Sequence, residues 1–267
     1  MHGSSKRNVL GIFIDAVDYE AAVEFVIRTA GEKRGAAISA VAVHGLMMGV
    51  LDREHKFRLN RFDLLVPDGQ PVRWALNLLH HERLPDRVYG PNLTLKVCAR
   101  AAAKGLPVYF YGSTREVLSA LRGALERKCP GLRIVGMEPS KFRRLLPNEK
   151  AELANRIRLS GAAITFVGLG CPRQEVFAFE FREALGMPIL SVGAAFPFLA
   201  GMVSQAPLWM QDAGLEWLFR LVTEPRRLWR RYVYLNPAYL FLVALQALRI
   251  SRFQTQERRP IGEVLYG

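Results

Sequence analysis

Asp68 stands in the segment VPDGQPV, after an apolar run and before a helix-like one. A carboxylate in such a position can act as a general base when a substrate hydroxyl lies within hydrogen-bond reach. It can also cap the following helix, because Asp is a favoured N-cap residue and Pro71 comes early in that helix. The position alone leaves both roles open.

The segment VGLGCPRQE offers Gln174 to hydroxyl groups, Arg173 to a phosphate and Cys171 as a nucleophile. A cysteine nucleophile needs a partner base, and all five histidines precede this segment without forming a recognisable nucleophile pattern. We therefore reject a cysteine mechanism. No DxD or HxxxH spacing offers ligands to a divalent ion, so we predict a site without a metal or another cofactor.

Arginines gather near the C-terminus, where EPRRLWRRY follows Arg220. On one continuous helix Arg220, Arg227 and Arg230 would share a face, whereas Arg226 and Arg231 would point elsewhere. Three arginines on one face can hold a diphosphate through charge-assisted hydrogen bonds. The alternative is a solvated basic face, which is the usual meaning of a run of charges.

The elements that would position these residues follow from the alternation of short apolar runs with amphipathic stretches. We predict strands at residues 9–14, 37–43, 62–66, 108–111, 132–135, 164–167 and 189–192. We predict helices at residues 18–29, 72–79, 93–103, 114–128, 148–159 and 174–185. This order is typical of an α/β, Rossmann-like domain with a mainly parallel sheet and helices on both faces, which we assign to residues 1–201.

Ligands of such sheets bind outside the carboxyl ends of the strands. Four loops there place Gly or Asp directly after an apolar run: VPDGQPV, FYGSTRE, VGLGCPRQE and SVGAAFPFLAG. Glycine allows backbone N–H groups to approach a phosphate or a sugar closely, although it also serves simple turns. The candidate ligand-binding glycines are Gly69, Gly112, Gly168, Gly170 and Gly193.

Residues 202–267 give a nearly continuous helical pattern and form the predicted C-terminal appendage, with residues 254–267 polar enough to fray. Residues 232–250 are apolar and aromatic but contain Asn236, Pro237 and Gln246. Spanning a bilayer takes about 20 predominantly apolar residues, so this segment is too short and too interrupted. We predict that it lies in the plane of an anionic membrane surface. The alternative is a helix packed on its own domain or on another subunit.

Composition limits the partners. The chain has 267 residues, is 50% hydrophobic and carries a formal net charge of +13, which allows a large core and favours a polyanionic partner. Nucleic-acid binding would need aromatic residues interleaved with the basic ones, whereas here the basic cluster adjoins an apolar segment. The three cysteines form no paired motif, and no signal peptide is recognisable, so we expect a cytoplasmic protein.

Seven blocks together resemble the WecG/TagA/CpsF family of glycosyltransferases, which make bacterial cell-surface polymers. They are VLGIFIDAVDYEAAVE, LNRFDLLVPDGQPV, RVYGPNLT, VYFYGSTRE, FVGLGCPRQE, VGAAFPFLAG and APLWMQDAGLEWLFRLVTEPRRLWRRY. The resemblance implies inverting, metal-independent transfer from a UDP-sugar to a polyprenyl-diphosphate-linked sugar, by an enzyme attached peripherally to the cytoplasmic face of the membrane. It makes Asp68 the general base and places Gln174 in the sugar-nucleotide pocket. It also implies that the arginines of the appendage close over the diphosphate, and it makes Arg87 and Asn92 of RVYGPNLT candidate substrate ligands.

The sequence departs from the family pattern at several positions near the expected cleft. Ser39 or His44 of ISAVAVHG would have to replace a Thr-x-Asn element, and Asn92 stands where Asp is common. Pro197 and Leu208 replace a usual acidic and a usual basic residue. These changes leave the transferred sugar open. They also keep a non-catalytic basic scaffold and a nucleic-acid-binding protein as alternatives, and whether the chain forms a homo-oligomer is not decided.

Overall fold

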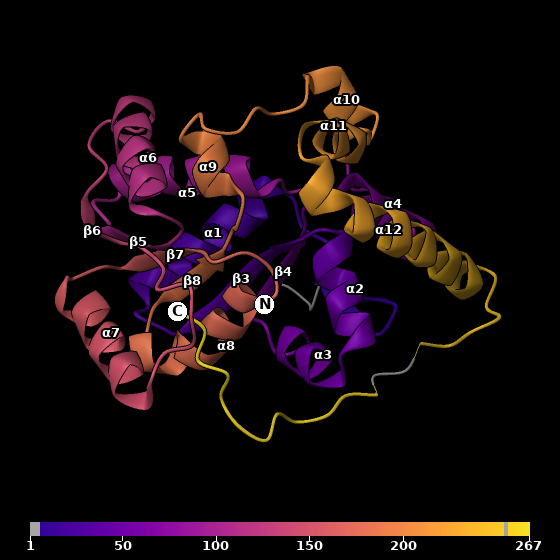
Figure 1. Ribbon diagram of the computed structural model, residues 1–267, viewed down its shortest axis with the longest axis horizontal. Helices are drawn as coiled ribbons and strands as arrows, with labels where there is room; N and C mark the ends of the chain where they lie inside the picture. Colours follow the sequence, from indigo (N-terminus) through magenta and orange to yellow (C-terminus); the bar gives the residue numbers. More distant parts are fainter. Residues whose placement is uncertain (1–5, 254–255) are drawn as a thin grey trace.

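The computed structural model describes residues 6–253 and 256–267, except for the side chains of Arg227 and Arg231. Its centre is a six-stranded sheet in which every neighbouring pair is parallel, in the order β4-β3-β8-β7-β5-β6 (Figure 1). The predicted α/β class is confirmed. The strands are β3 (Ala36–Val41), β4 (Leu64–Pro67), β5 (Val108–Gly112), β6 (Ile134–Glu138), β7 (Ile164–Gly168) and β8 (Pro188–Ser191).

Helices cover both faces of this sheet because successive strand residues point to opposite sides and both sides are apolar. In β5, Val108 and Phe110 join one core cluster, whereas Tyr109 and Tyr111 join the other. The first cluster is closed by α1 (Tyr19–Gly31), α5 (Gly90–Ala103), α6 (Arg115–Lys128) and α9 (Ala195–Leu199). The second is closed by α2 (Val43–Leu51), α3 (Arg53–Leu59), α4 (Gln70–His80), α7 (Pro147–Leu159) and α8 (Arg173–Leu185).

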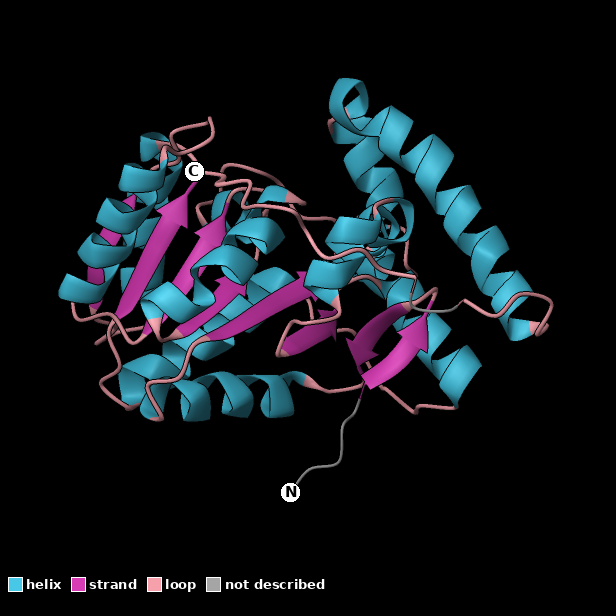
Figure 2. Ribbon diagram, turned by 90° about the horizontal axis from the view of Figure 1, so that it is seen from below, coloured by secondary structure: helices cyan, strands magenta, loops and turns pink. Residues whose placement is uncertain are grey.

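Several of the predicted strands have other bounds in the structure; for example, the strand predicted at residues 132–135 is β6. The predicted strand at residues 9–14 is instead a hairpin of β1 (Lys6–Val9) and β2 (Ile12–Asp15), separate from the main sheet (Figure 2). The chain turns at Leu10 and Gly11, whose φ angles of 55° and 85° are incompatible with an extended strand. The predicted strand at residues 37–43 ends at Val41, and α2 begins two residues later.

The C-terminal region contains α10 (Leu208–Asp212), α11 (Glu216–Thr223) and α12 (Pro225–Ala247). A continuous helix carrying Arg220 and Arg230 in one phase is not formed. Glu224 has φ −128° and ψ 53°, and Pro225 is the first residue of α12. Proline disfavours helical geometry in the residue before it, so the chain changes direction between α11 and α12.

One face of α12 packs on the core. Tyr239 and Val243 are buried against the α2–α4 side, and the Tyr239 hydroxyl donates to the Pro71 carbonyl oxygen at 3.0 Å. The Gln246 amide donates to the Asn8 carbonyl oxygen at 2.9 Å. The sequence alternative of a helix packed on its own domain therefore holds for this face.

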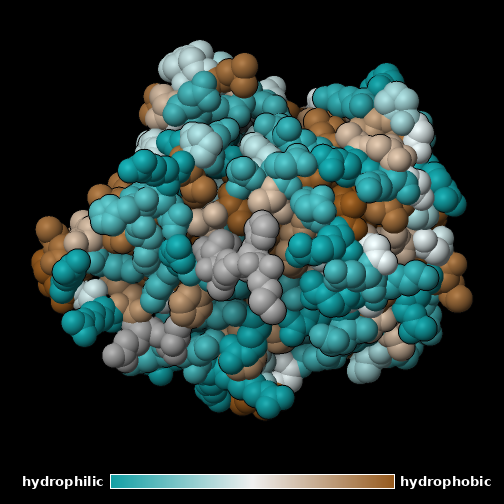
Figure 3. Space-filling model, turned by 180° about the vertical axis from the view of Figure 1, so that it is seen from behind, coloured by the Kyte–Doolittle hydropathy of each residue, from teal (hydrophilic) through white to brown (hydrophobic). Residues whose placement is uncertain are grey.

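The opposite face of α12 is exposed and apolar. Figure 3 shows hydrophobic surface at the margin formed by α10 and the far end of α12. No helix among the described residues combines the length and the apolar character needed to cross a bilayer. The exposed large hydrophobic side chains of α12 are Trp229, Val233, Tyr234, Leu240 and Phe241.

The described tail, residues 256–267, runs back across the core (Figure 1) instead of fraying as predicted. The backbone N–H groups of Val264 and Leu265 donate to the Glu180 carboxylate at 2.7 and 3.0 Å. The Leu145 N–H group donates to the Leu265 carbonyl oxygen at 2.6 Å. The half-buried carboxylate of Glu180 fixes the tail, and the polar composition of the tail does not predict this contact.

Candidate active site

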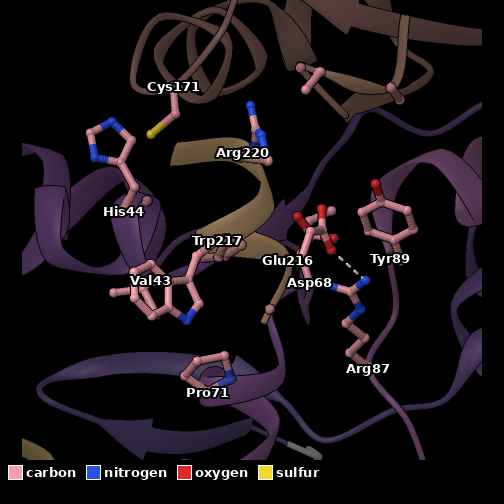
Figure 4. Close-up of a pocket in the computed structure, with 18 of the residues that line it drawn as sticks. Val43, His44, Asp68, Pro71, Arg87, Tyr89, Cys171, Glu216, Trp217 and Arg220 are labelled. Carbon is pink, nitrogen blue, oxygen red and sulfur yellow. Dashed lines mark ion pairs between the residues drawn. The ribbon is translucent and has the colours of Figure 1, made fainter. Parts of the chain in front are cut away.

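A cavity of about 510 Å³ opens at the carboxyl ends of β3, β4, β7 and β8, beneath α11 and the start of α12. Figure 4 shows Asp68, Arg87 and Glu216 together on one side of it, with His44 and Cys171 on the other. Trp217 lies between the two groups. The cavity therefore brings carboxylates and arginines from the α/β core and from the appendage into one space.

Asp68 follows β4 and faces the cavity. Its Oδ1 accepts a hydrogen bond of 2.9 Å from the N–H group of Gly90, the first residue of α5. The sequence alternative of a cap on the next helix is wrong, because the N-cap of α4 is Gly69 and has no side-chain hydrogen bond. The Asp68 carboxylate thus supports the start of α5 while lining the cavity.

The electrostatic surroundings make Asp68 a weak acid. The pKa of Asp68 is raised to about 6, mainly by burial and also by the negative charge of Glu216. Arg87, the Gly90 N–H group and Arg220 act in the opposite direction. At neutral pH most of the carboxylate is ionised, and a pKa near the working pH suits a general base.

Arg87 is buried and pairs with the appendage. Its Nη2 lies 2.6 Å from Glu216 Oε2 (Figure 4). It also donates to Gln211 Oε1 at 3.1 Å. Its guanidinium stacks 4.3 Å from the centre of the Tyr89 ring. The ion pair therefore links the segment before α5 to α11, and both residues line the cavity.

A second polar group lies at the start of α8. The Gln174 amide Nε2 donates to Glu175 Oε1 at 2.9 Å, and the Ser39 hydroxyl donates to the same oxygen at 3.0 Å. Burial raises the pKa of Glu175, whereas the bonds from Gln174 and Ser39 and the nearby Cys171 thiol lower it. Gln174 and Glu175 line the cavity, and Ser39 lies behind them.

Two of the three predicted appendage arginines face the cavity from different helices. Arg220 of α11 and Arg230 of α12 both line it. Arg220 lies 3.7 Å from Glu224 and 5.5 Å from the centre of the Phe198 ring, and its buried Nε has no hydrogen-bond partner among the described residues. The side chain of Arg227 lies outside the described part of the chain.

The other predicted site residues divide into two groups. Around Asp68 the cavity is lined by His44, Gly69, Arg87, Gly170, Gln174 and Gly193. Five candidates lie outside the lining: Ser39, Asn92, Gly112, Gly168 and Arg173.

Three of the four glycine loops therefore meet at the cavity. The fourth, FYGSTRE, follows β5, which β7 separates from β8. A side chain at Gly112 would clash with the backbone of Gly168, and one at Gly168 would clash with the Phe196 ring, so both glycines allow close packing. Thr114 and Arg115 instead line a separate hollow of about 400 Å³ with residues of the segment after β6.

Sequence reasoning missed two carboxylates in the cavity. Glu175 directly follows the predicted site residue Gln174 in VGLGCPRQE, so the sequence could have identified it as a second candidate. Glu216 has no such signal, because its position depends on how α11 folds over the sheet. In the described ranges no group of three or more His, Cys, Asp and Glu side chains is arranged to hold a metal ion. The absence of a metal from the reaction stays a prediction.

Comparison of the sequence with protein family models gives a match over most of the chain. The sequence model of the glycosyl transferase WecG/TagA/CpsF family matches residues 7–253 of the 267. The matched range includes all the cavity-lining residues, those of α11 and α12 among them.

Proposed function

The chain belongs to the glycosyl transferase WecG/TagA/CpsF family and is a glycosyltransferase of cell-surface polysaccharide synthesis. From that premise we propose that it transfers a hexose, an N-acetylhexosamine or a uronic acid from a UDP-sugar to a polyprenyl-diphosphate-linked sugar, with inversion at the anomeric carbon. The observation that carries this proposal is the half-buried Asp68 carboxylate in one cavity with Arg87 and Arg220.

Asp68 acts as the base. A hydroxyl of the acceptor sugar attacks the anomeric carbon, the Asp68 carboxylate takes the hydroxyl proton, and the bond from that carbon to the UDP oxygen breaks. Attack from the face opposite the leaving group gives inversion. The Gly90 N–H bond holds one oxygen of Asp68 in place, which orients the other toward the acceptor.

The arginines neutralise the leaving diphosphate. Arg220 and Arg230 line the cavity, and Arg87 adds a third guanidinium once its bond to Glu216 is exchanged for a phosphate oxygen. Guanidinium groups bind phosphate through paired charge-assisted hydrogen bonds and provide the charge stabilisation that a divalent ion provides elsewhere. We therefore propose that transfer needs no metal.

The lipid-linked acceptor brings the enzyme to a membrane. The exposed apolar face of α12, together with the basic residues at its start, supports peripheral attachment to an anionic surface on the cytoplasmic side. The acceptor diphosphate would then reach the cavity from the side where the appendage lies.

The test is a transfer assay with a panel of UDP-sugars and a short-chain lipid-diphosphate sugar, with and without EDTA. We expect one or a few UDP-sugars to be consumed, equally in both conditions. Asp68→Asn should lose about two to four orders of magnitude in kcat, because the amide keeps the bond to Gly90 but cannot take the proton. Turnover by this variant within a few-fold of wild type would remove Asp68 from the mechanism.

The fold of Asp68→Asn provides the control. Because burial raises the pKa of this acid in the folded state, its ionisation costs stability, and that cost grows as the pH rises from about 4 to above 6. The neutral amide avoids this cost. The variant should therefore melt at or above the wild-type temperature at neutral pH, and a loss of activity with a lowered melting temperature would indicate misfolding instead.

A further inference from the structure

The orientation of the Gln174 side-chain amide is fixed by its hydrogen bond to Glu175. The side chains of Gln174 and Glu175 are both almost fully buried, with exposed fractions of 4% and 2%. Glu175 Oε1 accepts from Gln174 Nε2 and from the Ser39 hydroxyl. An ionised carboxylate only accepts hydrogen bonds, so the NH2 group of Gln174 has to face Glu175. A neutral Glu175 would still offer its carbonyl oxygen to the same two donors.

The amide oxygen of Gln174 is directed to the opposite side. It is buried and has no hydrogen-bond partner among the described residues. Gly193 has φ +47°, and a Cβ atom there would be only 2.9 Å from the Gln174 oxygen. The Ser191 hydroxyl donates to the Gln174 backbone carbonyl at 2.9 Å and holds the start of α8 in place.

A buried acceptor without a donor is costly, and such groups are normally paired when a ligand is bound. Both residues line the cavity, so the missing donor can come from its occupant. We infer that Glu175 is a positioning residue that turns the Gln174 carbonyl oxygen toward the sugar nucleotide, and that this oxygen selects for a hydrogen-bond donor on the ligand. The inference rests on the proposed function, and the donor is either a sugar hydroxyl or the N3–H group of uracil.

Binding titrations can identify the donor. The probes are UDP, N3-methyl-UDP, UDP-glucose and UDP-N-acetylmannosamine, together with analogues of each sugar nucleotide in which one hydroxyl is replaced by fluorine, which does not donate. We expect wild type to bind one of these modified probes about fivefold to tenfold more weakly than its parent, the effect of one lost hydrogen bond. Weaker binding of N3-methyl-UDP than of UDP would identify the uracil N3–H group as the donor. Weaker binding of a fluorinated sugar nucleotide than of its parent would identify the replaced sugar hydroxyl.

In Glu175→Gln the residue-175 amide can donate or accept, so the Gln174 amide is free to turn over. The sensitive probe and its parent should then bind within about twofold of each other, while UDP-sugar binding itself persists. Glu180→Gln makes the same substitution on α8, where the carboxylate holds the tail rather than the cavity, and should keep the wild-type ratio. A purely structural role of Glu175 would weaken every probe equally and leave the ratio unchanged.

Gln174→Met removes the amide oxygen while keeping a side chain of nearly the same length. It should also bring the affinity ratio between the sensitive probe and its parent close to one, which keeps the inference testable if Glu175→Gln does not fold. The inference would be overturned if either folded variant kept the wild-type affinity ratio between the sensitive probe and its parent, or if wild type bound every modified probe as tightly as its parent. Transfer activity of wild type in the panel would leave the proposed function intact in both cases. Failure of wild type to bind UDP or either UDP-sugar, with no transfer in the panel, would overturn the proposed function and the inference with it.

Discussion

At the scale of single residues, the charges of Glu216, Arg87 and Arg220 set the pKa of Asp68 together with its burial. Glu216 raises the pKa of Asp68 and also neutralises Arg87, which otherwise lowers it. Tyr89 contacts the same pair, and its own pKa is raised by burial, so its phenol stays protonated and adds no charge. The protonation of Asp68 therefore depends on a residue supplied by the appendage.

This coupling predicts a pH effect. In wild type the acid limb of kcat/KM should lie near pH 6, because a base with a pKa of about 6 loses its proton there. Glu216→Gln removes a negative charge beside Asp68 and frees Arg87, and both changes lower the pKa. The acid limb should therefore move to lower pH in a profile measured with saturating acceptor.

Asp212→Asn is the matched control for that profile. It removes one negative charge from the same appendage, but Asp212 does not line the cavity. Its acid limb should coincide with that of wild type. If Glu216→Gln and Asp212→Asn gave the same profile, Asp68 would not be the titrating base or Glu216 would not act on it.

The sequence could point to Asp68 and Gln174 because each stands next to a turn at the end of a predicted strand, where parallel sheets bind ligands. It could not point to Glu216. Reading Glu216 as a cavity residue requires knowing that α11 lies over β3 and β4, and this depends on packing between segments more than a hundred residues apart.

At the scale of elements, the parallel sheet could be predicted because each central strand is an apolar run buried on both faces. The helices α2 and α3 could not be recognised in the same way. They have nine and seven residues, and α3 buries His55, Lys56 and Arg58, which reverses the usual pattern. Helical periodicity is unreliable over so few residues.

The break between α11 and α12 changes which arginines are expected to matter. On a single helix, Arg220 and Arg230 would lie on the same face because of their spacing. Instead they belong to two helices and reach the cavity from different directions. Arg226 is exposed and is not part of the lining. The arginine function therefore depends on the turn at Glu224 and Pro225.

Arg220→Ala and Arg230→Ala should each lower kcat/KM about tenfold to a hundredfold, the cost of one charge-assisted contact to a phosphate. Arg226→Ala should stay within about threefold of wild type. Steady-state kinetics at fixed ionic strength, with the lipid-linked acceptor in detergent, measures this without a membrane. Equal losses at all three positions would indicate a diffuse basic surface rather than a phosphate site.

At the scale of the whole molecule, the appendage and the core are interleaved. Residues before α1 contact α12 through Asn8 and Gln246, and the tail after α12 returns to Glu180 of α8. Removing all residues after the α10–α11 region would therefore expose the α2–α4 face and release Glu180. Substitutions on the exposed face of α12 test the membrane proposal without these side effects.

Leu240 and Phe241 are adjacent on that face, with exposed fractions of 59% and 64%. Burying the exposed parts of these two side chains in a bilayer contributes about 2–4 kcal/mol, and placing two carboxylates there adds repulsion from anionic headgroups. The double variant Leu240→Glu/Phe241→Glu should lose at least about tenfold in affinity for vesicles containing phosphatidylglycerol, measured by flotation. Leu146→Glu/Leu159→Glu introduces the same two charges at exposed leucines around α7 and should bind like wild type. Transfer to the acceptor in detergent should be unaffected in both, because neither pair lines the cavity. Undiminished vesicle binding by the α12 variant would show that this face does not meet the membrane and would favour a protein partner for it.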